Sequence, residues 1–160
     1  MGLDAVVYCD CYEKGGLRVP PPPGVSLRVG WDGSLERESD PGSLEADLAF
    51  DQWRQSACEH EDGVLLHHRL GNITLIGYLR SELQREEERF PILLARVLYS
   101  GTHSGDYLDP DIIPALQKEI GGLSGFKCGT QETTGLMSEF RAQMSALAAA
   151  ALSAGKPVVF

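Results

Sequence analysis

The order of apolar and polar positions predicts strands near the two ends of the chain. Residues 3–9 alternate with a period of two, the spacing of a half-buried strand. The face that holds Leu3 and Val7 is apolar, whereas the opposite face carries Asp4 and Tyr8. We therefore expect the first face to meet the core. Residues 156–160 are β-branched and aromatic at their end and predict a short closing strand.

Two further strand predictions lie in the first half of the chain. Residues 25–31 and 34–38 flank Asp32 and Gly33, a dipeptide that is typical of a two-residue hairpin turn. Residues 64–69 follow a second Asp-Gly turn and are also rich in strand-forming residues. The strands thus cluster early, and one lies at the very end.

The remaining apolar residues recur at the three-to-four-residue spacing of helices. The expected helices cover residues 46–57, 73–89, 92–99, 110–120 and 136–154. Residues 92–99 are also compatible with a buried strand, but Pro91 before them favours a helix. We expect Asp109 to cap the fourth helix, with Pro110 in its first turn, and Gly155 to end the last one.

This order of elements predicts an α+β fold, because strands that come in a run are followed by helices that come in a run. We expect a small antiparallel sheet, made of the N-terminal strands and the C-terminal strand, packed with four to five helices. With 160 residues, 42% of them hydrophobic, the chain is long enough for a core of its own. We expect a single domain over residues 1–160.

The net charge changes which partners can be expected. The chain has 14 Lys and Arg against 23 Asp and Glu, a formal net charge of −9. This balance argues against nucleic acid and against anionic membranes, since both are bound largely through basic residues. No apolar run reaches the roughly 20 residues that span a membrane, and the first residues lack the pattern of a signal peptide. We expect a cytoplasmic protein with reduced thiols.

Cys9, Cys11, Cys58 and His60 are the residues that best suit a metal ion. Thiolate and imidazole ligands are those of tetrahedral zinc sites, but C-x-C and C-x-H are not the usual ligand spacings. We therefore favour a packing role, in which Cys9 continues the apolar face of the first strand. A metal site and a redox pair remain alternatives.

His103, Ser104 and Asp106 lie in a glycine-rich loop and form the candidate functional loop. Ser104 lacks the glycine spacing of a nucleophile elbow, and Asp106 follows Gly105 where a phosphate-binding loop would have lysine. We therefore assign no catalytic residue. The loop is still the preferred place for a site, because loops on a scaffold carry function more often than the scaffold does.

Several stretches together resemble a family of small bacterial α+β proteins, some of which are predicted immunity proteins of polymorphic-toxin systems. The stretches are residues 1–4, 79–83, 90–94, 100–101 and 116–120, and a last helix that ends in an alanine-rich turn before Phe160. They are packing and turn motifs, so the resemblance implies a fold and a class of function and no site residues.

The expected function is that of a non-enzymatic protein-binding module, an immunity-type inhibitor that meets a basic protein partner through an acidic surface. No cofactor is expected for this function. One alternative is a metal- or thiol-dependent enzyme that uses some of five residues, Cys9, Cys11, Cys58, His60 and His103, and another is a purely structural or oligomeric component. An enzyme site requires that the cysteine pair, His60 and the loop from His103 to Asp106 converge on one cleft, whereas their dispersal indicates a packing domain.

Overall fold

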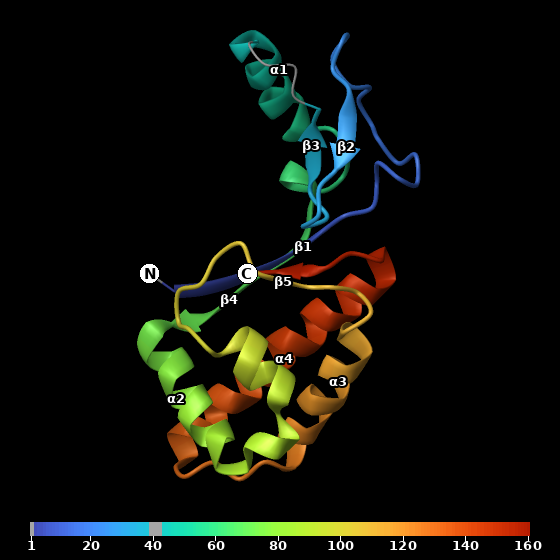
Figure 1. Ribbon diagram of the computed structural model, residues 1–160. Coiled ribbons are helices and arrows are strands. Elements are labelled where there is room, and N and C mark those ends of the chain that lie inside the picture. Colours follow the sequence, from blue (N-terminus) through green and yellow to red (C-terminus); the bar gives the residue numbers. More distant parts are fainter. Residues whose placement is uncertain (1, 39–42) are drawn as a thin grey trace.

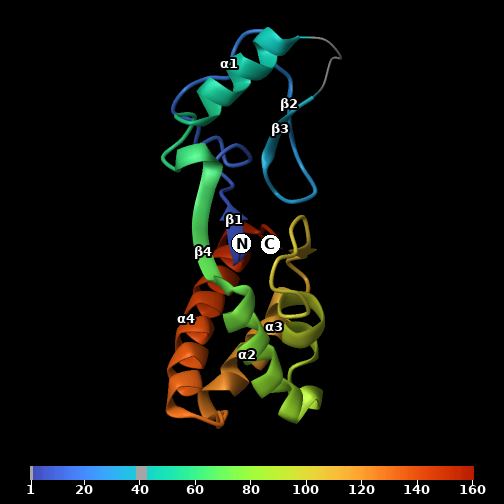
Figure 2. The ribbon, with the colours of Figure 1, turned by 90° about the vertical axis from the view of Figure 1, so that its left-hand side faces the viewer.

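The computed structural model describes residues 2–38 and 43–160, and its chain forms two parts joined by a pair of strands (Figure 1). The chain runs through β1 (Gly2–Tyr8), leaves for the upper part in the view, and returns through β4 (Val64–Asn72). We call residues 10–63 the outer lobe, and residues 2–9 with 64–160 the body. Figure 2 shows β4 running from one part into the other.

The sheet of the body is antiparallel and has the strand order β4-β1-β6-β5. β1 pairs with β4 along its whole length, from Gly2 opposite Asn72 to Tyr8 opposite Val64. On its other side it meets β6 (Val158–Val159), which in turn pairs with β5 (Tyr107–Leu108). The two chain ends are thereby brought together in one sheet, and the expected α+β class is confirmed.

The helices of the body cover one face of this sheet (Figure 1). They are α2 (Ile73–Leu83), α3 (Ile113–Gly122) and α4 (Gln131–Ala154), with a π-helical turn at Leu93–Val97. Leu3, Ala5 and Val7 point into the resulting core and are at most 1% exposed, as their alternation predicts. The core comprises 25 buried residues, all of them in the body.

The outer lobe has a separate and much smaller core. It consists of the hairpin β2 (Leu27–Val29) and β3 (Leu35–Arg37) and the helix α1 (Leu44–Arg54). Phe50, Trp53 and Ala57 form its hydrophobic cluster, and the indole N–H of Trp53 donates to the carbonyl of Val19 at 2.9 Å. The lobe is therefore held together by a small core around one aromatic pair.

Contacts other than the strands also join the lobe to the body. The Lys156 ammonium, which is almost fully buried, pairs with Glu13 and donates to the carbonyl of Gly33 at 3.0 Å. The rings of Trp31 and Tyr107 lie with their centroids 4.8 Å apart. One lysine of the body thus contacts two segments of the lobe.

Several expected elements differ from those observed. The hairpin forms at Asp32 and Gly33, but it makes a sheet of its own and does not extend the main one. The helix expected over residues 73–89 ends as α-helix at Leu83, and a 3-10 segment with Glu86 off helical geometry follows. Met1, with which the family resemblance begins, lies outside the described residues.

Two further differences concern the middle of the chain. The helix expected after Asp109 begins only at Ile113, because Pro114 occupies its first turn, where proline is favoured, while Asp109 and Pro110 form a turn before it. The short strand β5 was not expected at all. The helix favoured for residues 92–99 is confirmed as the π-helical turn.

Candidate metal centre

Cys9, Cys11, Cys58 and His60 come together at the neck between the outer lobe and the body. Cys9 and Cys11 directly follow β1, and Cys58 and His60 shortly precede β4. Because β1 and β4 are antiparallel neighbours, the segment after the first lies beside the segment before the second. The pairing of two strands therefore brings together residues that are 49 positions apart in the sequence.

A tight turn after β1 places the first two cysteines. The Cys9 amide donates to the carbonyl of Gly63 at 2.8 Å, which continues the strand pairing by one residue. The chain then turns, and the Gly16 amide donates to the carbonyl of Cys11 at 2.7 Å. Gly15 has a φ of 70°, a left-handed conformation that glycine adopts without strain. Cys11 is thus held near Cys9.

A second turn places His60. The Gly63 amide donates to the carbonyl of His60 at 3.1 Å, and Asp62 and Gly63 both have left-handed φ values, 53° and 70°. Aspartate and glycine are among the residues that tolerate this conformation. The Asp-Gly dipeptide before β4 therefore makes the bend that carries His60 back toward the cysteines.

The distances between the ligand atoms are short. Cys9 Sγ lies 3.7 Å from Cys58 Sγ. The Nδ1 atom of His60 lies 3.3 Å from Cys11 Sγ and 4.0 Å from Cys58 Sγ. All four ligand atoms lie within 4.8 Å of one another, and the thiols are free.

These distances suit one tetrahedral zinc ion. With Zn–S bonds of about 2.3 Å and a Zn–N bond of about 2.0 Å, tetrahedral ligands lie about 3.5–3.8 Å apart. The Cys9–Cys58 distance already has this value, and the widest pair needs to close by about 1 Å. Three thiolates and one imidazole are a common ligand set of structural zinc, with His60 coordinating through Nδ1 and keeping its proton on Nε2.

The surroundings of the cluster hold its thiols in the protonated form unless a cation binds them. Burial raises the pKa of the Cys9 thiol above its ordinary value. Burial, followed by the neighbouring thiols of Cys9 and Cys58, raises the pKa of Cys11 to about 12. The surroundings thus disfavour negative thiolates, and a bound divalent ion reverses this preference because it deprotonates the thiols it coordinates.

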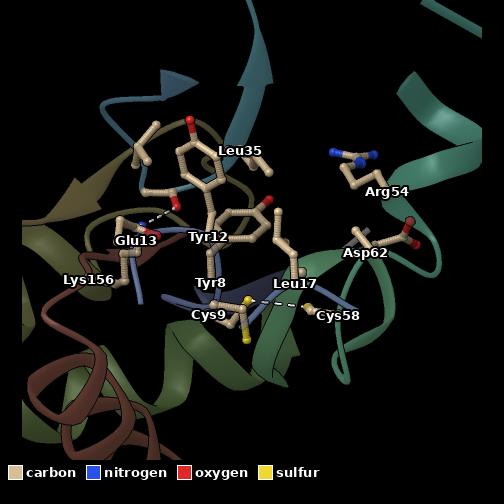
Figure 3. Close-up of a pocket in the computed structure, with 15 residues that line it drawn as sticks. Tyr8, Cys9, Tyr12, Glu13, Leu17, Leu35, Arg54, Cys58, Asp62 and Lys156 are labelled. Atoms are coloured by element: carbon tan, nitrogen blue, oxygen red, sulfur yellow. Dashed lines mark hydrogen bonds and ion pairs between the residues drawn. The ribbon is translucent and has the colours of Figure 1, made fainter. Parts of the chain in front are cut away.

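A narrow pocket lies against the cysteines (Figure 3). Cys9 and Cys58 lie on one side of it, near Tyr8, with the Glu13–Lys156 ion pair at another edge. Its cavity volume is about 30 Å³, which is room for about two water molecules. The pocket as it stands has room for a very small molecule.

The candidate functional loop lies elsewhere. His103 and Ser104 line a shallow hollow with Gly2 and Asp4, at the start of β1, whereas the cysteines follow its end. The sequence-predicted site residues therefore form two separate groups: the Cys/His cluster at the neck, and the loop, in which His103 and Asp106 lie 3.0 Å apart.

Most polar groups of this loop are already used in contacts within the body. His103 Nε2 lies 2.9 Å from the carbonyl of Val97, and Nδ1 lies 3.0 Å from a carboxylate oxygen of Asp106 without a well-directed hydrogen bond. The Tyr99 hydroxyl donates to Asp106 and lowers the pKa of that carboxyl. The Phe160 amide donates to the carbonyl of Asp106 at 2.8 Å. The loop thereby holds the C-terminus in place.

The packing role favoured for Cys9 does not describe what the structure shows. Cys9 is half-buried and lies outside the main core, and its sulfur faces Cys58. Sequence reasoning also overlooked Lys156, whose charge gave no sign that it is buried against the lobe. One signal of the cluster was present in the sequence: Cys9 and Cys11 lie at the end of one predicted strand, and Cys58 and His60 lie before another.

Comparisons with family models, with curated proteins and with solved structures find no significant match to this chain. Within residues 2–38 and 43–160, none of the helices combines the length and the apolar character needed to cross a membrane. The interpretation of the site therefore depends on its own geometry.

Proposed function

We propose that this protein binds one zinc ion through Cys9, Cys11, Cys58 and His60, and that the ion fastens the outer lobe to the body. The observation that carries the proposal is the approach of all four ligand atoms to within 4.8 Å of one another, from two segments far apart in sequence. An ion bound there ties the start of the lobe to its end. It acts as a clasp at the neck.

The ligand set supports a structural ion rather than a catalytic one. A catalytic zinc site keeps one position open for water or substrate, whereas four protein ligands complete the tetrahedron. The pocket beside the cluster has room for about two water molecules. A role in organising a non-enzymatic module fits these features better than metal-dependent catalysis does.

A thiol-dependent enzyme is less well supported. The nucleophilic form of cysteine is the thiolate, and catalytic cysteines have a lowered pKa. Burial raises the pKa of both Cys9 and Cys11. These thiols are therefore poorly suited to acting as free nucleophiles at neutral pH.

Metal analysis of the untagged protein tests the proposal. We expect one zinc per chain by inductively coupled plasma mass spectrometry, and less than about a tenth of that in Cys11→Ser, since loss of one ligand typically weakens a metal site strongly. Cys128→Ser is the matched control, because Cys128 lies outside the cluster. His60→Asn should lose the metal, and His67→Asn should keep it. A folded wild-type protein without stoichiometric metal would contradict the proposal.

A second function is favoured by the charge of the outer lobe. Residues 10–63 contain 12 acidic and 5 basic residues, whereas the other 106 residues contain 11 and 9. Four of the five basic side chains of the lobe pair with acidic residues of the lobe itself, as Lys14 does with Asp10. The net charge that remains on the surface of the lobe is therefore negative. Its natural partner is a basic protein, as the resemblance to immunity proteins suggests.

The outer face of α1 is the best candidate for the contact. Leu44 and Leu48 lie one turn apart and are 74% and 55% exposed, and Glu45 and Asp51 flank them. Co-expression with each basic toxin candidate encoded beside this chain tests the idea. Leu48→Ser with Asp51→Lys should abolish protection, and the matched exposed pair Glu132→Lys with Glu139→Lys on α4 should retain it. Undiminished toxicity beside the wild-type chain would refute the inhibitor function.

A further inference from the structure

Cys9 and Cys58 are placed to form a bond with each other as well as to hold a metal. Their sulfurs lie 3.7 Å apart, in van der Waals contact, and they come from the two sides of the neck. Cys11 Sγ has a different neighbour, the imidazole of His60 at 3.3 Å. Two of the three thiols in the cluster are thus paired across the neck (Figure 3).

A narrow pocket beside them is one route by which a small reagent reaches the sulfurs. Cys9, Cys11 and Cys58 all line it, and its cavity volume of about 30 Å³ holds about two water-sized groups. Hydrogen peroxide consists of two such oxygen atoms. A tripeptide disulfide such as oxidised glutathione is far too large for it.

We propose that the zinc centre is a peroxide-sensitive site, at which hydrogen peroxide joins Cys9 and Cys58 in a disulfide and releases the ion. The inference rests on the proposed zinc site. The Cys9 thiolate attacks one peroxide oxygen, the O–O bond breaks, and a sulfenic acid and hydroxide form. The Cys58 thiolate then attacks that sulfur and displaces a second hydroxide. Two electrons pass from sulfur to peroxide, and solvent protons convert both hydroxides to water.

Zinc leaves because its ligand set is broken. After oxidation only Cys11 and His60 remain as donors, and the freed Cys11 thiolate takes a proton from solvent. The new disulfide joins the same two segments that the ion had joined, since Cys9 follows β1 and Cys58 precedes β4. Oxidation therefore replaces one clasp of the neck by another, and the lobe stays attached while its metal is lost.

The test uses the zinc-loaded full chain and hydrogen peroxide. We expect one zinc released per chain to a chromophoric chelator, two of the four thiols lost, and a Cys9–Cys58 cross-link in peptide mapping. Cys128→Ser should behave like the wild type and lose the same two thiols. Retention of zinc under peroxide, or a cross-link that joins Cys9 to Cys11 or involves Cys128, would overturn the inference.

Two further arms separate this inference from the zinc proposal. Peroxide treatment of chelator-stripped protein should give the same Cys9–Cys58 cross-link, more slowly at neutral pH because burial raises the pKa of the free Cys9 thiol, and the pairing is thus tested even if the purified chain holds no zinc. Oxidised glutathione should release zinc at least tenfold more slowly than peroxide at equal concentration. Equal rates would show that the pocket does not select the oxidant, and stoichiometric zinc that peroxide cannot release would leave the zinc site intact and refute its redox sensitivity.

Discussion

The body and the outer lobe are built from one chain but are held together in different ways. In the described residues, the hydrophobic core of the body contains 25 buried residues between a sheet and its helices, whereas that of the lobe contains Phe50, Trp53 and Ala57. Units of about 50 residues or fewer seldom bury enough surface to fold alone, and many of them depend on a metal or on disulfides. The proposed zinc site at the neck lies beside this weaker part.

Charge and exposed apolar surface follow the same division. The lobe accounts for a net −7 of the chain's −9, and like charges at close range oppose compaction. Among residues 2–38 and 43–160, it also carries six of the ten large apolar side chains that are exposed: Tyr12, Val19, Val29, Trp31, Leu44 and Leu48. The body is thus the stable scaffold of the molecule. The exposed apolar and acidic side chains of the lobe do not contribute to its own packing, so the lobe is the part suited to binding a partner.

Removal of the metal should have the largest effect, and only on the lobe. Structural zinc contributes about 10 kcal/mol or more to the folding of small zinc domains, while the body keeps its own core. Hydrogen exchange with a zinc chelator should show loss of amide protection across residues 17–37 and 44–57. Protection in β1 and α4 should persist.

Two other results would contradict this difference in stability between the lobe and the body. If chelation leaves the exchange of the lobe unchanged, the lobe is stabilised by its aromatic pair and by Lys156 without a metal. If the body loses protection together with the lobe, the two parts fold as one unit and the neck is no boundary.

Core truncations in the two parts should differ next. Phe140 is 1% exposed at the centre of the body, so Phe140→Ala should lower the global free energy of unfolding by about 3–5 kcal/mol. Trp53→Ala removes half of the lobe's aromatic pair, and it should leave the urea transition of the body unchanged to within about 0.5 kcal/mol. A loss of more than about 2 kcal/mol in that transition would show that the two cores are coupled.

Much of the fold could be predicted from sequence because its signals are local. Alternation in residues 3–7 identified the buried face of β1. Gly33 and Gly155 adopt left-handed φ values of 82° and 63°, at the hairpin turn and the helix end where they were expected. What could not be predicted was which strands would pair, because the hairpin of the lobe and β5 depend on neighbours far away in sequence.

The candidate site could not be predicted for the same reason. Neither Cys9 with Cys11 nor Cys58 with His60 has the ligand spacing of a known zinc motif, so each pair alone favoured a packing role. The register of β1 on β4, with Tyr8 opposite Val64, is what turns two unremarkable pairs into one cluster. The sequence alone does not show that these two pairs, far apart along the chain, lie close together in space.

The link between lobe and body through Lys156 should have a moderate effect. Lys156→Met keeps the apolar stem but leaves the Gly33 carbonyl and Glu13 without their ammonium partner. Loss of such a bond to a charged donor costs about 1–3 kcal/mol. Exchange should rise in residues 30–34 and at Glu13 and stay constant in α4. Lys118→Met, on an exposed face of α3, is the matched control, and an equal effect there would refute a specific link.

The smallest expected effect lies wholly in the body and depends on pH. The Gly129 amide donates to both carboxylate oxygens of Glu82, at 3.0 and 3.1 Å, and together with Arg85 this lowers the Glu82 pKa below 4.5. Because the unfolded chain binds that proton more readily, the bond stabilises the fold above about pH 4.5 and is lost as the pH falls through the lowered value.

Glu82→Gln should therefore reduce the free energy of unfolding by about 0.5–1 kcal/mol at neutral pH, since the pair is near the surface, and the difference should vanish in acid. Urea titrations followed by helical circular dichroism measure it, because most helical residues lie in the body. Glu139→Gln, exposed on α4, should match the wild type at both pH values. A Glu82→Gln deficit that persists in acid would mean that the shape of the side chain matters and its charge does not. The stability of the body would then be independent of this ion pair. Electrostatic interactions would in that case matter for the lobe and not for the body.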